Sequence, residues 1–187
     1  MSNERCDHAA AIVRIDEAFR AGDLSGLIAA TNGRWVVPNG PMPIEIGQCL
    51  EYSIYHSPLA FVRELLELGA DTKPSHHSGF PPLIAALWQN PRPDPVPIVE
   101  LLLSFGADPD QRGMNDYTAL HVAVIERRAD VVALLLEHGA DRALRTRIDN
   151  LESALDLAVE IGDPSIVDLL RRRAGTADAR QGGRVNE

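Results

Sequence analysis

A seven-residue segment with the pattern Leu-Leu-x-x-Gly-Ala-Asp occurs three times in the chain, at residues 65–71, 102–108 and 135–141. The glycines of the three copies are 37 and 33 residues apart, and residues 166–174 resemble a fourth copy that has lost the glycine. A period of about 20–50 residues is typical of proteins built from stacked structural repeats. This periodicity limits the chain to architectures in which similar units pack side by side.

Each unit is predicted to form two short helices followed by an extended loop. Thr118 and Ser153 carry hydroxyls suited to the start of the first helix, and Pro81 occupies the same place in another unit. The second helix, near residues 131–136, is apolar on nearly every side and ends before a glycine, which adopts the left-handed turn at low cost. Two such helices cannot bury that much apolar surface alone, so we expect them to stack on copies of themselves in a solenoid.

Residues 118–123, Thr-Ala-Leu-His-Val-Ala, followed by the stretch 130–141, resemble the ankyrin repeat over nearly a full unit. The resemblance implies an all-α solenoid of helix-turn-helix units joined by β-hairpin-like loops. It covers residues 43–175, with repeats at about 43–75, 76–112, 113–147 and 148–175.

The two ends of the chain fall outside this pattern. Residues 18–24 match the family's turn between helices, so we expect residues 1–42 to form an N-terminal capping helix pair and an approach loop. We expect residues 176–187 to be a disordered tail. The arginines at 171–173 suit a polar cap on a terminal repeat better than they suit a phosphate site.

The first two repeats depart from the family pattern. The first carries Gln48 and Glu51 where the family prefers threonine and histidine, and its long approach, residues 33–47, is rich in turn residues. The second has four extra residues in the proline-rich stretch 91–97. This stretch is either a weak SH3-type ligand, since alternating prolines favour polyproline II, or a stiffened loop with Pro97 as the first helical residue.

The composition argues against several classes of partner. Asp and Glu total 27 against 18 Lys and Arg, a net charge of −9, whereas nucleic-acid binders display basic stripes. No apolar run is long enough to span a membrane, the charged start is unlike a secretory signal, and Cys6 and Cys49 belong to no metal-binding pair. We therefore expect a cytoplasmic protein with no nucleic-acid or membrane partner; its preference for arginine over lysine is a weak bacterial signature.

Candidate metal and catalytic motifs are incomplete. Residues 108–113 begin like a calcium-binding loop, but Arg112 and Ala119 stand where oxygen ligands are needed. His76 and His77 are adjacent, so their rings point to opposite sides of an extended hairpin. The resemblance implies that His121 is a hydrogen-bonding structural residue at the start of its helix. We therefore expect no cofactor, no bound metal and no catalytic residue.

The resemblance implies that a partner binds a concave surface, made of the loop tips and the exposed face of each repeat's first helix. Carried over by position, the expected partner-binding residues are Tyr55, His56, His77, Phe80, Trp88, Gln89, Met114, Asn115, Tyr117, Ile125, Glu126 and Glu160.

Four of the nine aromatic residues of the chain, at positions 55, 80, 88 and 117, fall on this surface. Buried tryptophan and tyrosine side chains dominate the binding energy of many interfaces, so we expect a protein partner to dock on them. The alternative is that Phe80 and Trp88 pack between repeats or under the proline-rich insertion. Carboxylates near the groove favour a partner with a basic or mixed surface; they are Glu45, Glu51, Glu126, Glu152 and Glu160.

These features favour a non-enzymatic, monomeric adaptor, regulator or inhibitor that recognises an unidentified protein, although a fold alone never proves a function. An enzyme or small-molecule site in the groove is a second hypothesis. It would need a deep pocket with a strongly shifted pKa among Tyr55, His56 and Glu51, or between His121 and Glu126. A self-assembling structural protein, in which the aromatic face pairs with itself, is a third.

Overall fold

The computed structural model describes residues 2–40, 42–43, 46, 48–73, 80–88, 93–147 and 151–172. Within these ranges the chain is helical, apart from loops, one 3-10 turn at Met114–Asp116 and an isolated bridge between Arg145 and Ser153. The predicted all-α repeat fold is confirmed. The α-helices in the described part of the chain are α1 Ser2–Ala21, α2 Leu24–Thr31, α3 Cys49–His56, α4 Leu59–Glu67, α5 Pro82–Leu87, α6 Val96–Ser104, α7 Ala119–Ile125, α8 Ala129–Glu137, α9 Ala154–Ile161 and α10 Pro164–Arg171.

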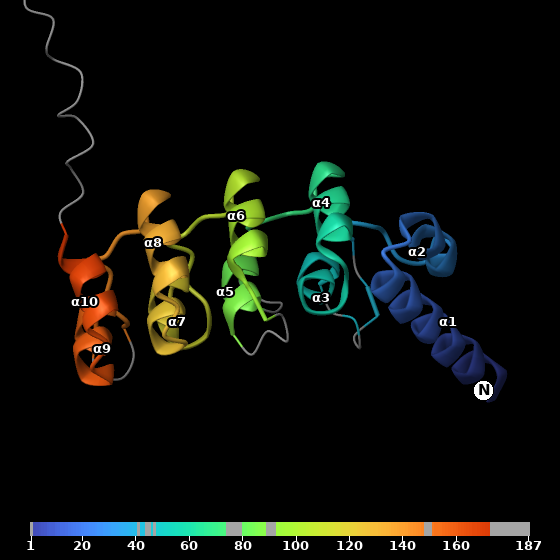
Figure 1. The fold of residues 1–187 in the computed structure, drawn as a ribbon. Coiled ribbons are helices and arrows are strands. Elements are labelled where there is room, and N and C mark those ends of the chain that lie inside the picture. The colour runs from blue at the N-terminus through green and yellow to red at the C-terminus, as the bar shows by residue number, and fades with distance from the viewer. Residues whose placement is uncertain are drawn as a thin grey trace, which may run out of the picture.

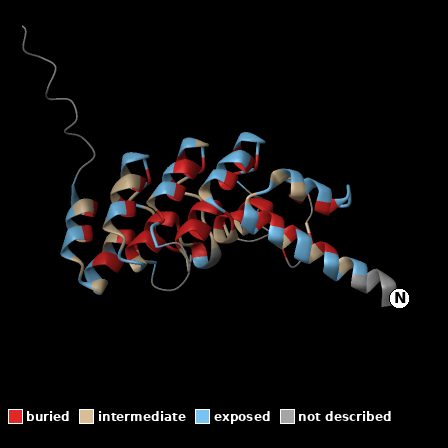
Figure 2. Ribbon diagram, turned by 45° about the vertical axis from the view of Figure 1, so that its right-hand side comes forward, coloured by how far each residue is buried: buried red, intermediate tan, exposed pale blue. Residues whose placement is uncertain are grey.

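Consecutive helices form pairs, and the pairs stand side by side in a row (Figure 1). The first helices of the repeats, α3, α5, α7 and α9, pack against one another in chain order and form one layer. The second helices, α4, α6, α8 and α10, form the other layer, while α1 runs obliquely away from the row (Figure 1). The buried residues lie mainly on the faces that the helices turn toward each other (Figure 2).

The buried apolar residues form one elongated core that runs along the row of repeats. Each repeat contributes its own part of it, such as Ile54 and Leu65 in the first repeat, Leu102 in the second and Leu135 in the third. This arrangement follows from the sequence period, because each helix pair buries its apolar stripe only against its neighbours. None of the helices in the described ranges combines the length and apolar character that a bilayer crossing requires.

The helix ends follow the expected local chemistry. Ser153 and Asp156 form a capping box at the start of α9, in which the Ser153 amide donates to the Asp156 carboxylate at 2.9 Å. At the other end of the repeats, Gly69, Gly106 and Gly139 have φ of 88°, 81° and 86° after α4, α6 and α8. Only glycine adopts this left-handed backbone at low cost, so each glycine turns the chain toward the next loop.

The prediction that Pro97 is the first helical residue is wrong by one position. Helix α6 begins at Val96, whose amide donates to the Asp94 carboxylate at 3.0 Å, and Pro97 is its second residue. The first four amides of a helix have no partner within the helix, so proline is accommodated there without loss of a hydrogen bond. The neighbouring residues 91 and 92 lie outside the described ranges, as do His76 and His77.

Side-chain hydrogen bonds join the loop before α3 to the loop after α4, and a similar hydrogen bond joins two later loops. Asn39 donates from its side chain to the Gly69 carbonyl at 2.7 Å and accepts from the Asp71 amide at 2.8 Å. In the later repeats the Asp110 carboxylate accepts from the Asp141 amide at 2.9 Å. A single polar side chain thus fixes the spacing between successive loops at both places.

Candidate functional site

Four of the predicted contact residues line one small cavity between α5 and α7, and three of them are aromatic while the fourth is the exposed Asn115. Phe80 precedes α5, Trp88 follows it, and Tyr117 precedes α7; the Trp88 and Tyr117 rings lie 6.5 Å apart between centroids. The cavity has a volume of about 70 Å³. Its lining consists of Phe80, Ile84, Trp88, Asn115, Tyr117 and Val122.

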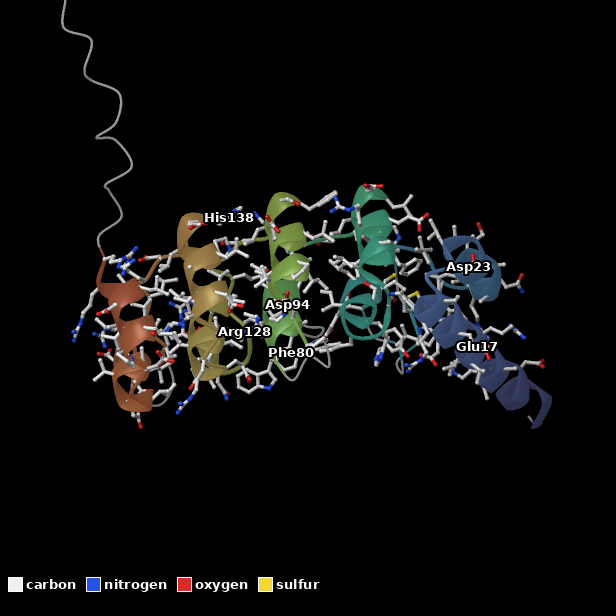
Figure 3. The ribbon with its side chains drawn as sticks, in the orientation of Figure 1. Glu17, Asp23, Phe80, Asp94, Arg128 and His138 are labelled. Carbon is white, nitrogen blue, oxygen red and sulfur yellow. The ribbon has the colours of Figure 1, made fainter. Side chains whose placement is uncertain are left out.

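The aromatic side chains of the cavity are half-buried. This lies between the two alternatives from the sequence, which were exposure to a partner and packing between repeats or under the proline-rich insertion. Phe80, Trp88 and Tyr117 pack against the apolar core and still expose part of each ring to solvent. Figure 3 shows Phe80 at the lower end of α5. The large apolar side chains that are mostly exposed lie elsewhere in the described ranges, for example Val36 and Leu68.

Tyr55 lies in the preceding repeat and is linked to this cluster through Glu51. The Glu51 carboxylate accepts a hydrogen bond from the Phe80 amide at 3.1 Å. Burial raises the pKa of Glu51, although the Phe80 amide partly opposes the shift. Burial, together with the nearby Glu51 charge, raises the pKa of Tyr55 to about 12. Glu51 and Tyr55 therefore extend the half-buried surface from α5 to α3.

The remaining predicted contact residues are dispersed. His56 lies toward α1, with its ring 4.4 Å from that of Tyr52, and burial followed by the nearby Arg20 charge lowers its pKa. Ile125 is half-buried, whereas Glu126 and Glu160 are exposed. His77, Gln89 and the side chain of Met114 lie outside what the structure describes.

His121 is occupied by structural contacts. Its ring is 1% exposed, Nδ1 accepts from the Thr118 amide at 3.3 Å, and Nε2 lies 3.3 Å from the Glu152 carbonyl. The neutral tautomer with a proton on Nε2 satisfies both contacts, because a carbonyl oxygen can only accept. Burial is the main cause that lowers the pKa of His121 and favours this neutral form.

Asp116 is a key polar residue that the sequence analysis missed. It is 7% exposed, has φ of 64°, and accepts from Arg147 Nε at 2.8 Å and Nη2 at 2.7 Å. Arg112 also donates to this carboxylate and to the Arg145 carbonyl, which joins two successive loops. The Arg147 bond, with further help from the Arg112 charge, holds the pKa of Asp116 below its usual value.

The only sequence signal for this bridge is that Arg112 fails as a calcium ligand. A cation in a loop rich in aspartate indicates an ion pair, but its partner in the next repeat becomes apparent only from the packing. The sequence analysis also missed two residues that line the cavity, Ile84 and Val122. Each lies four residues before a predicted contact residue. Positions i and i+4 share one helix face, so this spacing could have identified them.

The arrangement offers recognition more readily than acid/base chemistry. His121 is enclosed by its partners, His56 lies toward α1, and Glu51 already accepts a backbone hydrogen bond. In the described part of the chain, no three His, Cys, Asp or Glu side chains are grouped closely enough to hold a metal ion. What remains for a ligand is an apolar, aromatic-lined cavity with exposed polar groups around it.

Comparison with known proteins identifies a family with this repeat architecture. A family model described as ankyrin repeats (3 copies) matches residues 84–180. The human ankyrin repeat and SOCS box protein 6 is 42% identical over 74 residues, which cover 39% of this chain and 17% of that protein. The mouse protein phosphatase 1 regulatory subunit 27 is 32% identical over 102 residues, covering 54% of this chain and 60% of that protein.

A bacterial protein is also similar. A putative ankyrin repeat-containing protein of Treponema pallidum (strain Nichols) is 37% identical over 73 residues, covering 39% of this chain and 24% of that protein. The chain therefore spans less than two thirds of the length of each of these relatives. Because the family model matches just over half of the 187 residues, and the repeats stack as it requires, this chain belongs to the ankyrin-repeat family.

Proposed function

We propose that this chain is a non-enzymatic recognition module that binds a protein partner through the face bearing Phe80, Trp88 and Tyr117. The observation that carries the proposal is the 70 Å³ cavity that these three side chains surround between α5 and α7. Interface hot spots are enriched in tryptophan and tyrosine and cluster in pockets that lose their water on binding. A half-buried aromatic ring that is already held by its neighbours loses little conformational entropy when a partner covers it.

The family supports the same interpretation. Ankyrin repeats generally mediate protein–protein interaction. The name of the mouse relative describes a regulatory subunit, which acts together with another protein. An adaptor, regulator or inhibitor role is therefore the function that we assign to this chain.

The test begins by selecting binding partners from a display library of the host proteome on the immobilised full chain. The affinity of each selected partner is then measured for the wild-type chain and for two variants of it. Trp88→Ala should weaken binding at least about tenfold, as expected for an interface hot spot. Leu68→Ala is the matched control, because Leu68 is 50% exposed and lies at the end of α4 in the other layer. It should leave the affinity unchanged.

Circular dichroism of each variant shows whether it is folded. If Trp88→Ala fails to fold, Trp88→Phe and Tyr117→Phe provide milder changes at the same cavity. Recovery of no binder, or equal affinity for the wild type and a folded Trp88 variant, would contradict the proposal.

A further inference from the structure

The cavity beside Trp88 is small and mostly apolar. It is lined by Ile84 and Val122, which are at most 2% exposed, by the three aromatic side chains of Phe80, Trp88 and Tyr117, and by the polar residue Asn115. An apolar cavity of roughly 150 Å³ holds a benzene ring. A cavity of about 70 Å³ is therefore too small for an aromatic side chain and fits a branched aliphatic group.

The surroundings of the cavity are acidic. Glu126 follows α7 and is four residues after Val122, so it lies one turn beyond the cavity on the same helix face. Glu160 is exposed at the end of α9, in the next repeat, and the half-buried Glu51 lies in the preceding one. Carboxylates thus occur on the first helices of three repeats along this face.

Most of the neighbouring cations are already bound to carboxylates. Arg112 and Arg147 both donate to Asp116. Arg128 pairs with Asp94 at 3.3 Å and with Asp130 at 2.7 Å, and Figure 3 shows Arg128 and Asp94 close together. Arg127 is exposed beside Glu126. Since the whole chain carries a net charge of −9, the field around the cavity favours a cationic partner.

We infer that the cavity receives one aliphatic side chain from a basic, extended segment of the partner protein. The aliphatic group fills the apolar space between Trp88 and Tyr117, and lysine or arginine residues on its α7–α9 side lie near Glu126 and Glu160. This inference rests on the proposed function, because it specifies what that surface binds. The aliphatic group accounts for most of the affinity, and the charges raise the association rate and select the sequence.

The experiment uses a display library of random 12-residue peptides, selected on the immobilised full chain. The expected consensus is a Leu, Ile, Val or Met flanked by Lys or Arg. A synthetic consensus peptide should lose at least about tenfold in affinity when its aliphatic residue is replaced by Ala, and a similar amount when that residue is replaced by Trp.

The charges are tested on the protein itself. Glu126→Gln should weaken the consensus peptide by about two- to threefold and reduce the dependence of its association rate on salt. Glu137→Gln is the matched control, because Glu137 is an exposed carboxylate at the end of α8, and it should change neither quantity. Both variants keep all described cavity side chains, so they are informative even if Trp88→Ala does not fold.

The outcomes separate the two proposals. Peptides that depend on Trp88 but are acidic, or that tolerate Ala at the aliphatic position, would overturn this inference and leave the proposed function standing. Identical behaviour of Glu126→Gln and Glu137→Gln would also overturn it. Failure of the peptide library alone to yield a Trp88-dependent binder would overturn this inference, whereas failure of the host-protein library to yield one would overturn the proposed function.

Discussion

Helices α7 and α3 each form a side-chain hydrogen bond to the loop that precedes the next repeat's first helix. The two side chains occupy the same position in their repeats, but one donates and the other accepts. In α7, His121 donates from Nε2 to the Glu152 carbonyl, and its other nitrogen closes the start of the helix with Thr118. In α3, the equivalent residue is Glu51, whose carboxylate accepts from the Phe80 amide. Both contacts join a helix to the next loop, but only the histidine side chain also caps its own helix.

The residues around these two hydrogen bonds also differ: those beside His121 are ion-paired, and those beside Glu51 are aromatic. Beside His121, the Asp116 carboxylate binds Arg112 and Arg147 and ties two loops together. Beside Glu51, the half-buried rings of Tyr55 and Phe80 lead to the cavity at Trp88. The comparison indicates that the polar bonds beside His121 hold successive loops together, whereas the half-buried surface beside Glu51 leads to the cavity that is available to a partner.

Replacing His121 should have the largest effect on stability. His121→Ala removes the contacts to Thr118 and Glu152 and leaves a void in a site that is 1% exposed. We expect the free energy of unfolding to fall by about 2–4 kcal/mol, measured by urea denaturation. The matched control is His138→Ala at the exposed end of α8, which should change the value by less than about 0.5 kcal/mol. Equal losses for the two variants would contradict a structural role for His121.

Replacing Glu51 should have a smaller effect on stability, and its sign should depend on whether the new side chain can still accept a hydrogen bond. Glu51→Gln keeps a side-chain oxygen to accept from the Phe80 amide and removes a charge that burial disfavours. The free energy of unfolding at pH 7 should stay equal or rise by up to about 1 kcal/mol. Glu51→Ala, which leaves the Phe80 amide without this acceptor, should instead be destabilising by about 1 kcal/mol.

The pH dependence provides a second check on Glu51. Because its folded pKa is raised, the folded state binds more protons than the unfolded chain between the usual carboxyl pKa and the raised value. In that window the wild type should gain stability relative to Glu51→Gln as the pH falls. A difference between the two proteins that stays constant with pH would show that Glu51 does not titrate in this way.

The fold was predictable because it depends on periodic features. The repeated glycines, the capping residues Thr118 and Ser153 and the apolar stripes each act within one unit, so their spacing along the chain determines their spacing in the fold. The start of α6 was misplaced by one residue because the alternating prolines before it are compatible with more than one position in the first turn. The side chain that decided the boundary was Asp94, through its bond to the Val96 amide.

The site was predictable only in part. The positions of Phe80, Trp88 and Tyr117 on one face followed from the repeat, but their half-burial around a shared cavity depends on packing between two repeats. The bridge from Asp116 to Arg147 spans 31 residues and was invisible for the same reason. Contacts between repeats depend on which rotamers neighbouring units allow, and a sequence period carries no information on that.

The two tryptophans of the chain allow the most direct test of where a partner binds. Trp88 lines the cavity, whereas Trp35 lies near the N-terminal helix pair, with its ring 6.1 Å from His8 and with Arg34 over it at 5.5 Å. The measurement is a two-dimensional NMR titration of the full chain with the peptide selected from the random library, following the two indole N–H signals. Trp88→Phe assigns them. The account predicts a saturable shift of the Trp88 signal while the Trp35 signal stays in place; a shift of Trp35 alone, or of neither signal, would contradict it.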